Sequence, residues 1–129
     1  VKDTLPLVME ALENVGLGHT LDLMPAELSG GMKRRVALAR TLILQPKLIL
    51  YDEPTSGLDP ITSKEIIELM REIQRKYGTS SLIITHDVDC ARVISERILL
   101  LVDGVNYAEG SYRELSGSAD PKIEAFFKK

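Results

Sequence analysis

The spacing of hydrophobic residues predicts two amphipathic helices in this chain. The first begins with a cap at Asp3 or Thr4, has a proline in its first turn and ends at Gly16 and Gly18. The second spans residues 61–77 and has charged residues at helix-pairing spacing on its opposite face. The expected apolar stripes are Leu5, Val8, Met9, Leu12 and Val15 in the first helix, and Ile66, Leu69, Met70, Ile73 and Tyr77 in the second.

Short apolar runs predict strands around the second helix. The run 48–51 follows Gln45-Pro46, which ends a helix expected over residues 31–44, and the next strand is expected at 81–85. Because the run 48–51 shows no polar alternation, we expect a strand that is buried on both faces of a parallel sheet.

The rest of the chain adds an antiparallel pair and short helices. Strand–helix–strand alternation predicts an α/β sandwich with its ligand off the carboxyl edge of the sheet. A tight Asp103-Gly104 turn requires the two strands that it joins to be antiparallel. The expected segments are strands at 98–102 and 105–108, a polar linker at 19–27, a short helix at 89–94, and two short helices within 111–129, broken near Gly117 and Pro121.

Length and composition narrow the class of protein. The 129 residues, 44% of them hydrophobic, suffice for one domain with a core. A formal net charge of −3 disfavours binding to the phosphate backbone of nucleic acid. A single cysteine, Cys90, excludes an internal disulfide and a cysteine-rich zinc site, and we expect a half-buried hydrophobe there. No apolar run approaches the roughly 20 residues that span a bilayer.

Two adjacent carboxylates, Asp52 and Glu53, end the first expected strand. Phosphoryl transfer needs Mg²⁺ on the phosphates and a residue that orients the attacking water. Asp52 would hold the magnesium shell and Glu53 would polarise the water as general base. Neighbouring strand residues point to opposite faces, so a turn at Pro54 has to bring both carboxylates toward one ligand. The alternative for such a pair in isolation is an ordinary acidic strand terminus.

A small-residue loop opens the helix expected over 31–44. Ser29, Gly30 and Gly31 would direct backbone N–H groups and the positive helix end at an anion, and glycine lets the backbone approach a phosphate closely. The alternative is a loop-to-helix junction with Ser29 as its cap. The loop's basic neighbours and its distance before Asp52 favour phosphate binding.

Three further polar positions are candidates of lower specificity. The imidazole of His86, after the strand at 81–85, can donate to a γ-phosphate oxygen or orient the water, although a lone strand-end histidine is more often structural. Asp59 is either a plain turn residue or part of the site. His19 is expected at the surface, and the basic run 33–35 is most simply a solvated helix face, with phosphate contact as the alternative.

Four of these motifs together resemble the C-terminal part of an ABC-type ATPase domain. Residues 28–32 are similar to the family's signature loop, 48–53 to its Walker B strand, 56–59 to its D-loop and His86 to its switch histidine. The resemblance covers essentially the whole chain. The family's P-loop and Q-loop would lie N-terminal to these residues, and no G-x-x-x-x-G-K-[ST] loop occurs among them.

The resemblance implies a partial P-loop NTPase sandwich: a mostly parallel sheet with flanking helices, preceded by part of a helical subdomain. On this interpretation, residues 1–45 belong to the helical signature subdomain. Residues 46–110 form the C-terminal part of the ATPase core, and 111–129 form a helical tail. We expect the chain to be part of a longer domain.

The resemblance also implies ATP and Mg²⁺ as cofactors and a dimer of two identical ATPase subunits. In this family each nucleotide lies between the P-loop of one subunit and the signature loop of the other. Ser29, Gly30 and Gly31 would therefore bind the γ-phosphate that a second subunit holds.

Other residues would act in the nucleotide site of their own subunit. Asp52 would serve Mg²⁺ indirectly, through water, and Glu53 would activate the attacking water. His86 would contact the γ-phosphate, and Asp59 would communicate across the dimer. Without a P-loop, we expect the chain alone to lack hydrolytic activity, and an exposed sheet edge to cause self-association.

Met32 stands where many members of the family have glutamine, and this substitution resembles the Mla/Mce lipid-transport subfamily, as do residues 59–62 and 110–127. That subfamily implies a transmembrane permease partner, no nucleic acid, and a cytoplasmic location peripheral to the inner face of the cell membrane. The alternatives are an importer or exporter of another substrate, a translation or DNA-repair ATPase, and an interaction domain that has lost the chemistry.

Overall fold

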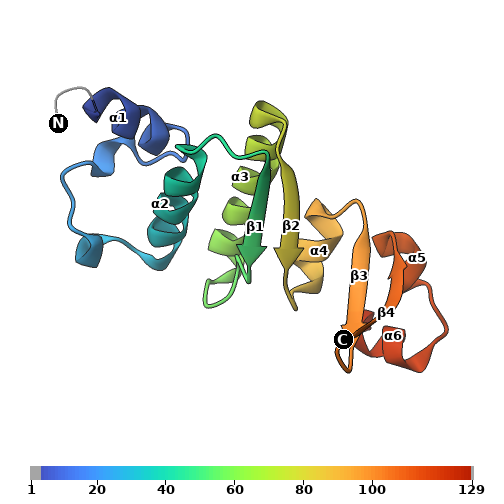
Figure 1. Ribbon diagram of the computed structural model, residues 1–129. Coiled ribbons are helices and arrows are strands. Elements are labelled where there is room, and N and C mark those ends of the chain that lie inside the picture. Colours follow the sequence, from blue (N-terminus) through green and yellow to red (C-terminus); the bar gives the residue numbers. More distant parts are fainter. Residues whose placement is uncertain (1–3, 129) are drawn as a thin grey trace. The chain divides into compact units, whose positions relative to one another are not determined.

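The computed structural model describes residues 4–128, which divide into two compact units (Figure 1). The first unit ends at Ile84 and the second begins at Thr85. Each unit combines helices with one two-stranded sheet and has its own hydrophobic core.

The first unit opens with helices α1 (Leu5–Glu13) and α2 (Gly30–Leu42), with two short 3₁₀ turns between them. These turns, η1 (Gly18–Thr20) and η2 (Pro25–Glu27), correct the expected polar linker at 19–27. The Thr20 hydroxyl is buried and donates to the Leu17 carbonyl at 2.8 Å, which gives this connection a fixed internal structure.

Helix α1 buries only the end of its predicted stripe. Thr4 occupies the N-cap position without a side-chain cap, and Asp3 lies outside the described residues. Ala11 and Val15 are buried in a core shared with α2, β1 and α3, whereas Leu5 and Val8 are exposed. The predicted stripe is therefore buried only toward its C-terminal end, where Leu12 and Val15 pack in the core that includes residues of α2.

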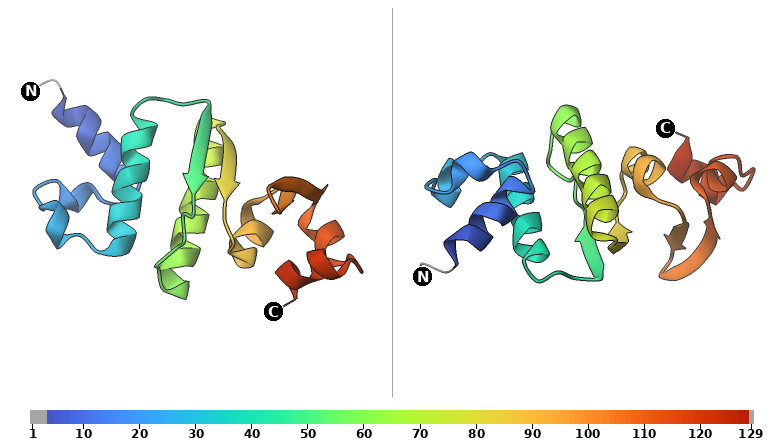
Figure 2. Two further views of the ribbon diagram at one scale, coloured as in Figure 1. Left: turned by 60° about the horizontal axis from the view of Figure 1, so that its bottom comes forward. Right: turned by 90° about the horizontal axis from the view of Figure 1, so that it is seen from above.

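A β-α-β segment completes the first unit and carries the candidate carboxylates. Strands β1 (Leu48–Asp52) and β2 (Ser80–Ile84) are parallel, as predicted, with Leu50 opposite Leu82, and α3 (Pro60–Tyr77) connects them. Figures 1 and 2 show α3 lying along one face of the strand pair. Its predicted apolar face is buried from Ile66 to Ile73, while Tyr77 is exposed. Gly78, in the left-handed region with φ of 61°, ends the helix.

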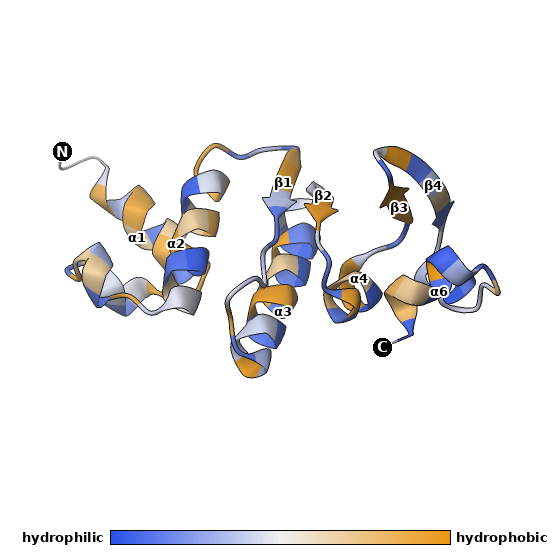
Figure 3. Ribbon diagram, turned by 90° about the horizontal axis from the view of Figure 1, so that it is seen from below, coloured by the Kyte–Doolittle hydropathy of each residue, from blue (hydrophilic) through white to orange (hydrophobic). Residues whose placement is uncertain are grey.

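The opposite face of this sheet is apolar and open to solvent. Leu48, Leu50, Leu82 and Ile84 share it and are 54%, 69%, 53% and 62% exposed. Figure 3 shows hydrophobic residues along β2. The prediction that residues 48–51 are buried on both faces was wrong, because α3 covers only the face of Ile49 and Tyr51, and among the described residues no element covers the other.

The second unit packs two short helices on an antiparallel hairpin. After α4 (Val88–Ile94), strands β3 (Ile98–Val102) and β4 (Val105–Gly110) pair antiparallel, as predicted, with an irregularity at Leu100/Leu101. Helices α5 (Tyr112–Ser116) and α6 (Pro121–Phe127) confirm the two predicted short helices. Its core is made of Leu100, Leu115 and Ile123.

The open sheet face leads us to expect self-association of the purified chain. Replacing Leu50 and Ile84 together by Gln should weaken association by about tenfold or more, because two exposed apolar side chains are removed from the contact. The matched control is Ile61→Gln, since Ile61 is equally accessible but lies on α3. Sedimentation velocity over a range of concentrations measures the effect, and a wild-type chain that stays monomeric throughout would contradict the expectation.

A second prediction concerns Tyr51, whose hydroxyl is buried and has no hydrogen-bond partner among the described residues. Burial raises the pKa of Tyr51 to about 12. Tyr51→Phe removes the unsatisfied hydroxyl, so stability should be unchanged or higher by up to about 1 kcal/mol. Urea denaturation measures this change, with Tyr77→Phe as the exposed control. A clear loss of stability in Tyr51→Phe would show that the hydroxyl is satisfied in solution.

Candidate functional site

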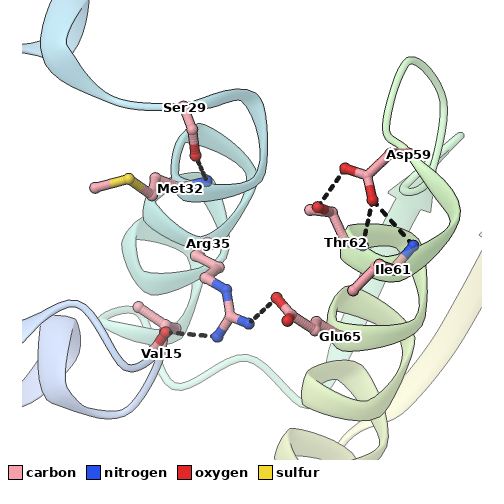
Figure 4. A network of polar contacts seen from close by, with 8 residues as sticks. All are labelled: Val15, Ser29, Met32, Arg35, Asp59, Ile61, Thr62 and Glu65. Carbon is pink, nitrogen blue, oxygen red and sulfur yellow. Dashed lines mark hydrogen bonds and ion pairs between the residues drawn. The ribbon is translucent and has the colours of Figure 1, made fainter.

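The glycine turn before α2 presents one open and one packed glycine. Ser29 is the N-cap, and its hydroxyl oxygen accepts a hydrogen bond from the Met32 N–H at 3.2 Å (Figure 4). Ser29 and Gly30 are exposed, whereas Gly31 is buried. Because the Ser29 hydroxyl binds the Met32 N–H, the other N–H groups of the first turn, near Ser29 and Gly30, are available to an anion. The two roles considered for Ser29, cap and phosphate contact, are therefore compatible.

Gly31 is needed for the contact between two helices. A Cβ added at Gly31 would lie 2.5 Å from Cγ2 of Thr62 on α3, whereas one added at Gly30 would lie 3.4 Å from Cδ2 of Leu58. Only the first distance is a clash. The sequence explanation, that both glycines allow phosphate to approach, is therefore incomplete for Gly31, because α3 occupies the space beside it.

The chain turns at Glu53 itself, one residue earlier than the sequence predicted. Glu53 has φ of 46°, a left-handed conformation uncommon for glutamate, while Asp52 is the last residue of β1 and is exposed. The Glu53 N–H donates to the Ile84 carbonyl at 2.8 Å, and its carbonyl accepts from the Ser56 N–H at 3.1 Å. These two bonds stabilise a conformation that costs on the order of 1–3 kcal/mol. Because of this turn, Glu53 does not continue the alternation of side chains between the two faces of the strand.

Asp52 fits an indirect role toward magnesium. Across residues 4–128 no group of three or more His, Cys, Asp or Glu side chains is placed to hold a metal ion. Mg²⁺ commonly keeps several waters and binds through one or two carboxylates plus substrate phosphates. An exposed carboxylate at the carboxyl end of a parallel strand suits this mode, in which water lies between protein and metal.

Asp59 uses both carboxylate oxygens to cap α3. Its Oδ1 accepts from the N–H groups of Ile61 and Thr62, each at 3.0 Å, and its Oδ2 accepts from the Thr62 hydroxyl at 2.5 Å (Figure 4). The Thr62 hydroxyl is the main reason that the pKa of Asp59 lies below its usual value. The structure therefore gives Asp59 a capping role, and communication across a dimer stays a prediction.

The basic run 33–35 is not a uniformly solvated face. Lys33 is exposed, but Arg34 Nη2 donates to the Ser56 carbonyl at 3.1 Å. Arg35 lies between two helices: Nη1 donates to the Val15 carbonyl at 3.0 Å and Nη2 to Glu65 Oε2 at 3.3 Å (Figure 4). The arginines therefore hold α2 against its neighbours, a role that sequence reasoning missed.

His86 belongs to the second unit, in the short connection between β2 and α4. It is exposed, and its neighbour Asp87 caps α4 by accepting from the N–H groups of Asp89 and Cys90 at 3.0 and 3.2 Å. Asp87 also donates its own N–H to the Thr85 hydroxyl at 3.0 Å. Cys90 is fully buried, and His19 is exposed as predicted. The first unit thus contains all the predicted site residues except His86.

A small cavity lies beside Asp52, between α2, β1 and α3. Its volume is about 150 Å³, and its lining includes Arg34 and Asp52 together with apolar residues such as Leu38 and Met70. Pockets that enclose drug-sized ligands measure about 300–1,000 Å³. This cavity is therefore too small to enclose a nucleotide, so a nucleotide at these carboxylates would need further walls.

A parallel β-α-β segment with carboxylates at its strand end is typical of α/β folds, in which ligands bind beyond the carboxyl ends of the strands. The family model described as "ABC transporter" matches residues 3–56 of the chain. No helix among residues 4–128 has the length and hydropathy needed to cross a membrane.

Two curated relatives name different transported substances. The chain is 42% identical over 119 residues to the intermembrane phospholipid transport system ATP-binding protein MlaF of Escherichia coli K12, covering 92% of the chain and 44% of that protein. It is also 42% identical over 125 residues to the methionine import ATP-binding protein MetN of Campylobacter jejuni, covering 97% of the chain and 37% of that protein. The chain therefore spans less than half the length of these relatives.

A solved structure confirms the predicted fold class. The ATP-binding cassette MJ0796, solved as a dimer in a post-hydrolysis state with ADP and Pi, superimposes with a TM-score of 0.73 and 34% identity. The superposition covers 87% of this chain and 48% of that one. The ABC ATPase fold, predicted from four motifs, is thereby confirmed for the part that this chain spans.

Acid should remove the cap of α3. Because the folded-state pKa of Asp59 is lowered, its stabilising effect is present above the unfolded-state pKa and is lost as pH falls through the folded-state value. We expect Asp59→Asn to be less stable than wild type at pH 6, and the difference to shrink as pH falls below the usual aspartate pKa of about 4. Urea midpoints across this range test the point, with Asp22→Asn as control. A stability gap that does not change with pH would contradict it.

Proposed function

We propose that this chain supplies the signature turn, the Walker B carboxylates and the switch histidine of an ABC transporter ATPase that works as a dimer. The capped turn at Ser29 and the redirected Glu53 in the same unit carry this proposal. The turn offers backbone N–H groups to an anion, and Glu53 offers a base at a strand end. Each is one wall of a nucleotide site, and the chain contains no phosphate loop to complete either.

In this proposal each residue has a distinct task. Backbone N–H groups at Ser29 and Gly30 bind the γ-phosphate of a nucleotide on a second, identical subunit. Glu53 accepts a proton from the attacking water, and Asp52 holds water in the magnesium shell. When bound, Mg²⁺ neutralises phosphate charge. His86 donates a hydrogen bond to the γ-phosphate of its own subunit, and Asp59 acts at the dimer interface while it caps α3.

We further propose phospholipid transport of the Mla/Mce type. The relation to MlaF supports it, as do Met32 and the segment 59–62. The matching relation to MetN supports methionine import as the second candidate. In either case the ATPase would bind a transmembrane permease at the cytoplasmic face of the membrane. This part of the proposal rests on similarity to these relatives and not on a substrate pocket.

ATP hydrolysis by the purified chain tests whether turnover requires a phosphate loop. We expect phosphate release from Mg-ATP no faster than in Glu53→Gln, because the chain has no phosphate loop to bind the nucleotide. Turnover by wild type that is lost in Glu53→Gln would overturn this expectation.

The residue roles are testable in a hybrid in which the part of MlaF that precedes its matched region is fused to this chain. Glu53→Gln should lower kcat by about 10²- to 10⁴-fold, the usual contribution of a general base. His86→Ala should also lower kcat, whereas the exposed control His19→Ala should not. Phosphate release measures all three. An active hybrid in which Glu53→Gln retains full activity would reject the assignment of the base.

A further inference from the structure

The starts of α2 and α3 are in close contact at Gly31 and Thr62. The space where a Gly31 Cβ would stand is filled by the Thr62 methyl group, at 2.5 Å from that position. Thr62 is half-buried, and Gly31 is buried. The glycine turn that faces the proposed phosphate is therefore backed by a single side chain of α3.

The direction of that methyl group is fixed by Asp59. The Thr62 hydroxyl donates to Asp59 Oδ2, while Asp59 Oδ1 accepts from the Thr62 N–H. Figure 4 shows the Thr62 hydroxyl held by Asp59. Because the hydroxyl position fixes the side-chain rotamer, the direction of the methyl group is also fixed, and this methyl group lies against Gly31. The capping carboxylate thus reaches the glycine turn through Thr62.

A second contact links the same two regions. Arg34, one turn along α2, donates to the Ser56 carbonyl in the loop that follows Glu53, and the Ser56 N–H donates to the Glu53 carbonyl. The beginning of α2 therefore contacts both the middle of the loop between β1 and α3 and the first turn of α3. Two independent contacts make relative movement of these segments costly.

We propose that Thr62 is a positioning residue that sets the glycine turn at Ser29–Gly31 relative to the loop carrying Glu53 and Asp59. This inference rests on the proposed function for its consequence in catalysis. The turn and Glu53 of one chain serve two different nucleotides in that function. Thr62 would then determine how strongly a movement of the glycine turn at one nucleotide displaces Glu53 at the other nucleotide.

A double-mutant cycle tests the contact. In an open helix start, Gly→Ala raises helix propensity, so Gly30→Ala should be neutral or stabilising. Gly31→Ala should instead lower the folding equilibrium constant by about tenfold or more, because its methyl group clashes with that of Thr62. Thr62→Ser, which lacks that methyl group, should restore Gly31→Ala to within about threefold and leave Gly30→Ala unaffected. Equal effects of both alanines, or no rescue, would overturn the proposal.

Amide NMR separates positioning from mere stability. Thr62→Val keeps a methyl group but loses the hydroxyl hydrogen bond to Asp59 Oδ2. The amide signals of Gly30, Gly31 and Met32 should therefore shift, while Ser63→Ala should leave them in place. Unshifted signals in Thr62→Val would overturn the proposal.

In the hybrid enzyme, Thr62→Val should lower kcat for ATP more than it changes KM. Both subunits carry the variant, so a displaced turn would misorient the γ-phosphate of each nucleotide without removing the phosphate contact. A wild-type hybrid without activity counts against the proposed function, and the NMR result still decides the coupling. An active hybrid in which Thr62→Val leaves kcat unchanged would overturn the positioning role.

Discussion

The first unit depends on how closely the starts of α2 and α3 approach each other. A side chain at Gly31 would separate them, and α2 would then lose the arginine contacts that hold it to the loop after β1 and to Glu65. Because interiors are close-packed, such a change cannot be absorbed locally. One missing Cβ therefore determines where the glycine turn stands relative to the carboxylates.

Much of the fold follows from local sequence signals. The strand after Pro46, the helix capped by Asp59 and ended by Gly78, and the Asp103-Gly104 hairpin could be predicted because their signals lie within a few residues of each element. The exposure of Leu48 and Leu50 could not be predicted, because the apolar composition of a strand does not show which other elements will cover it. The same limit applies to Leu5 and Val8 on α1.

The candidate site was predictable as residue types and not as geometry. Asp52, Glu53 and Ser29 stand out by spacing and position, but nothing in the sequence indicates a left-handed glutamate, because this conformation is imposed by the bonds to Ile84 and Ser56. Thr62 had a weak signal: it lies three residues after an aspartate, the spacing between an N-cap and its N3 residue. Its contact with Gly31 depends on tertiary packing, which no local pattern encodes.

The backbone of Glu53 has a consequence for laboratory evolution of this chain. Glycine adopts a positive φ without steric cost, so Glu53→Gly would relieve strain that the glutamate maintains. Selection for thermostability alone would therefore favour loss of the carboxylate that we propose as the general base. At this position, stability and the proposed catalytic role would be in conflict.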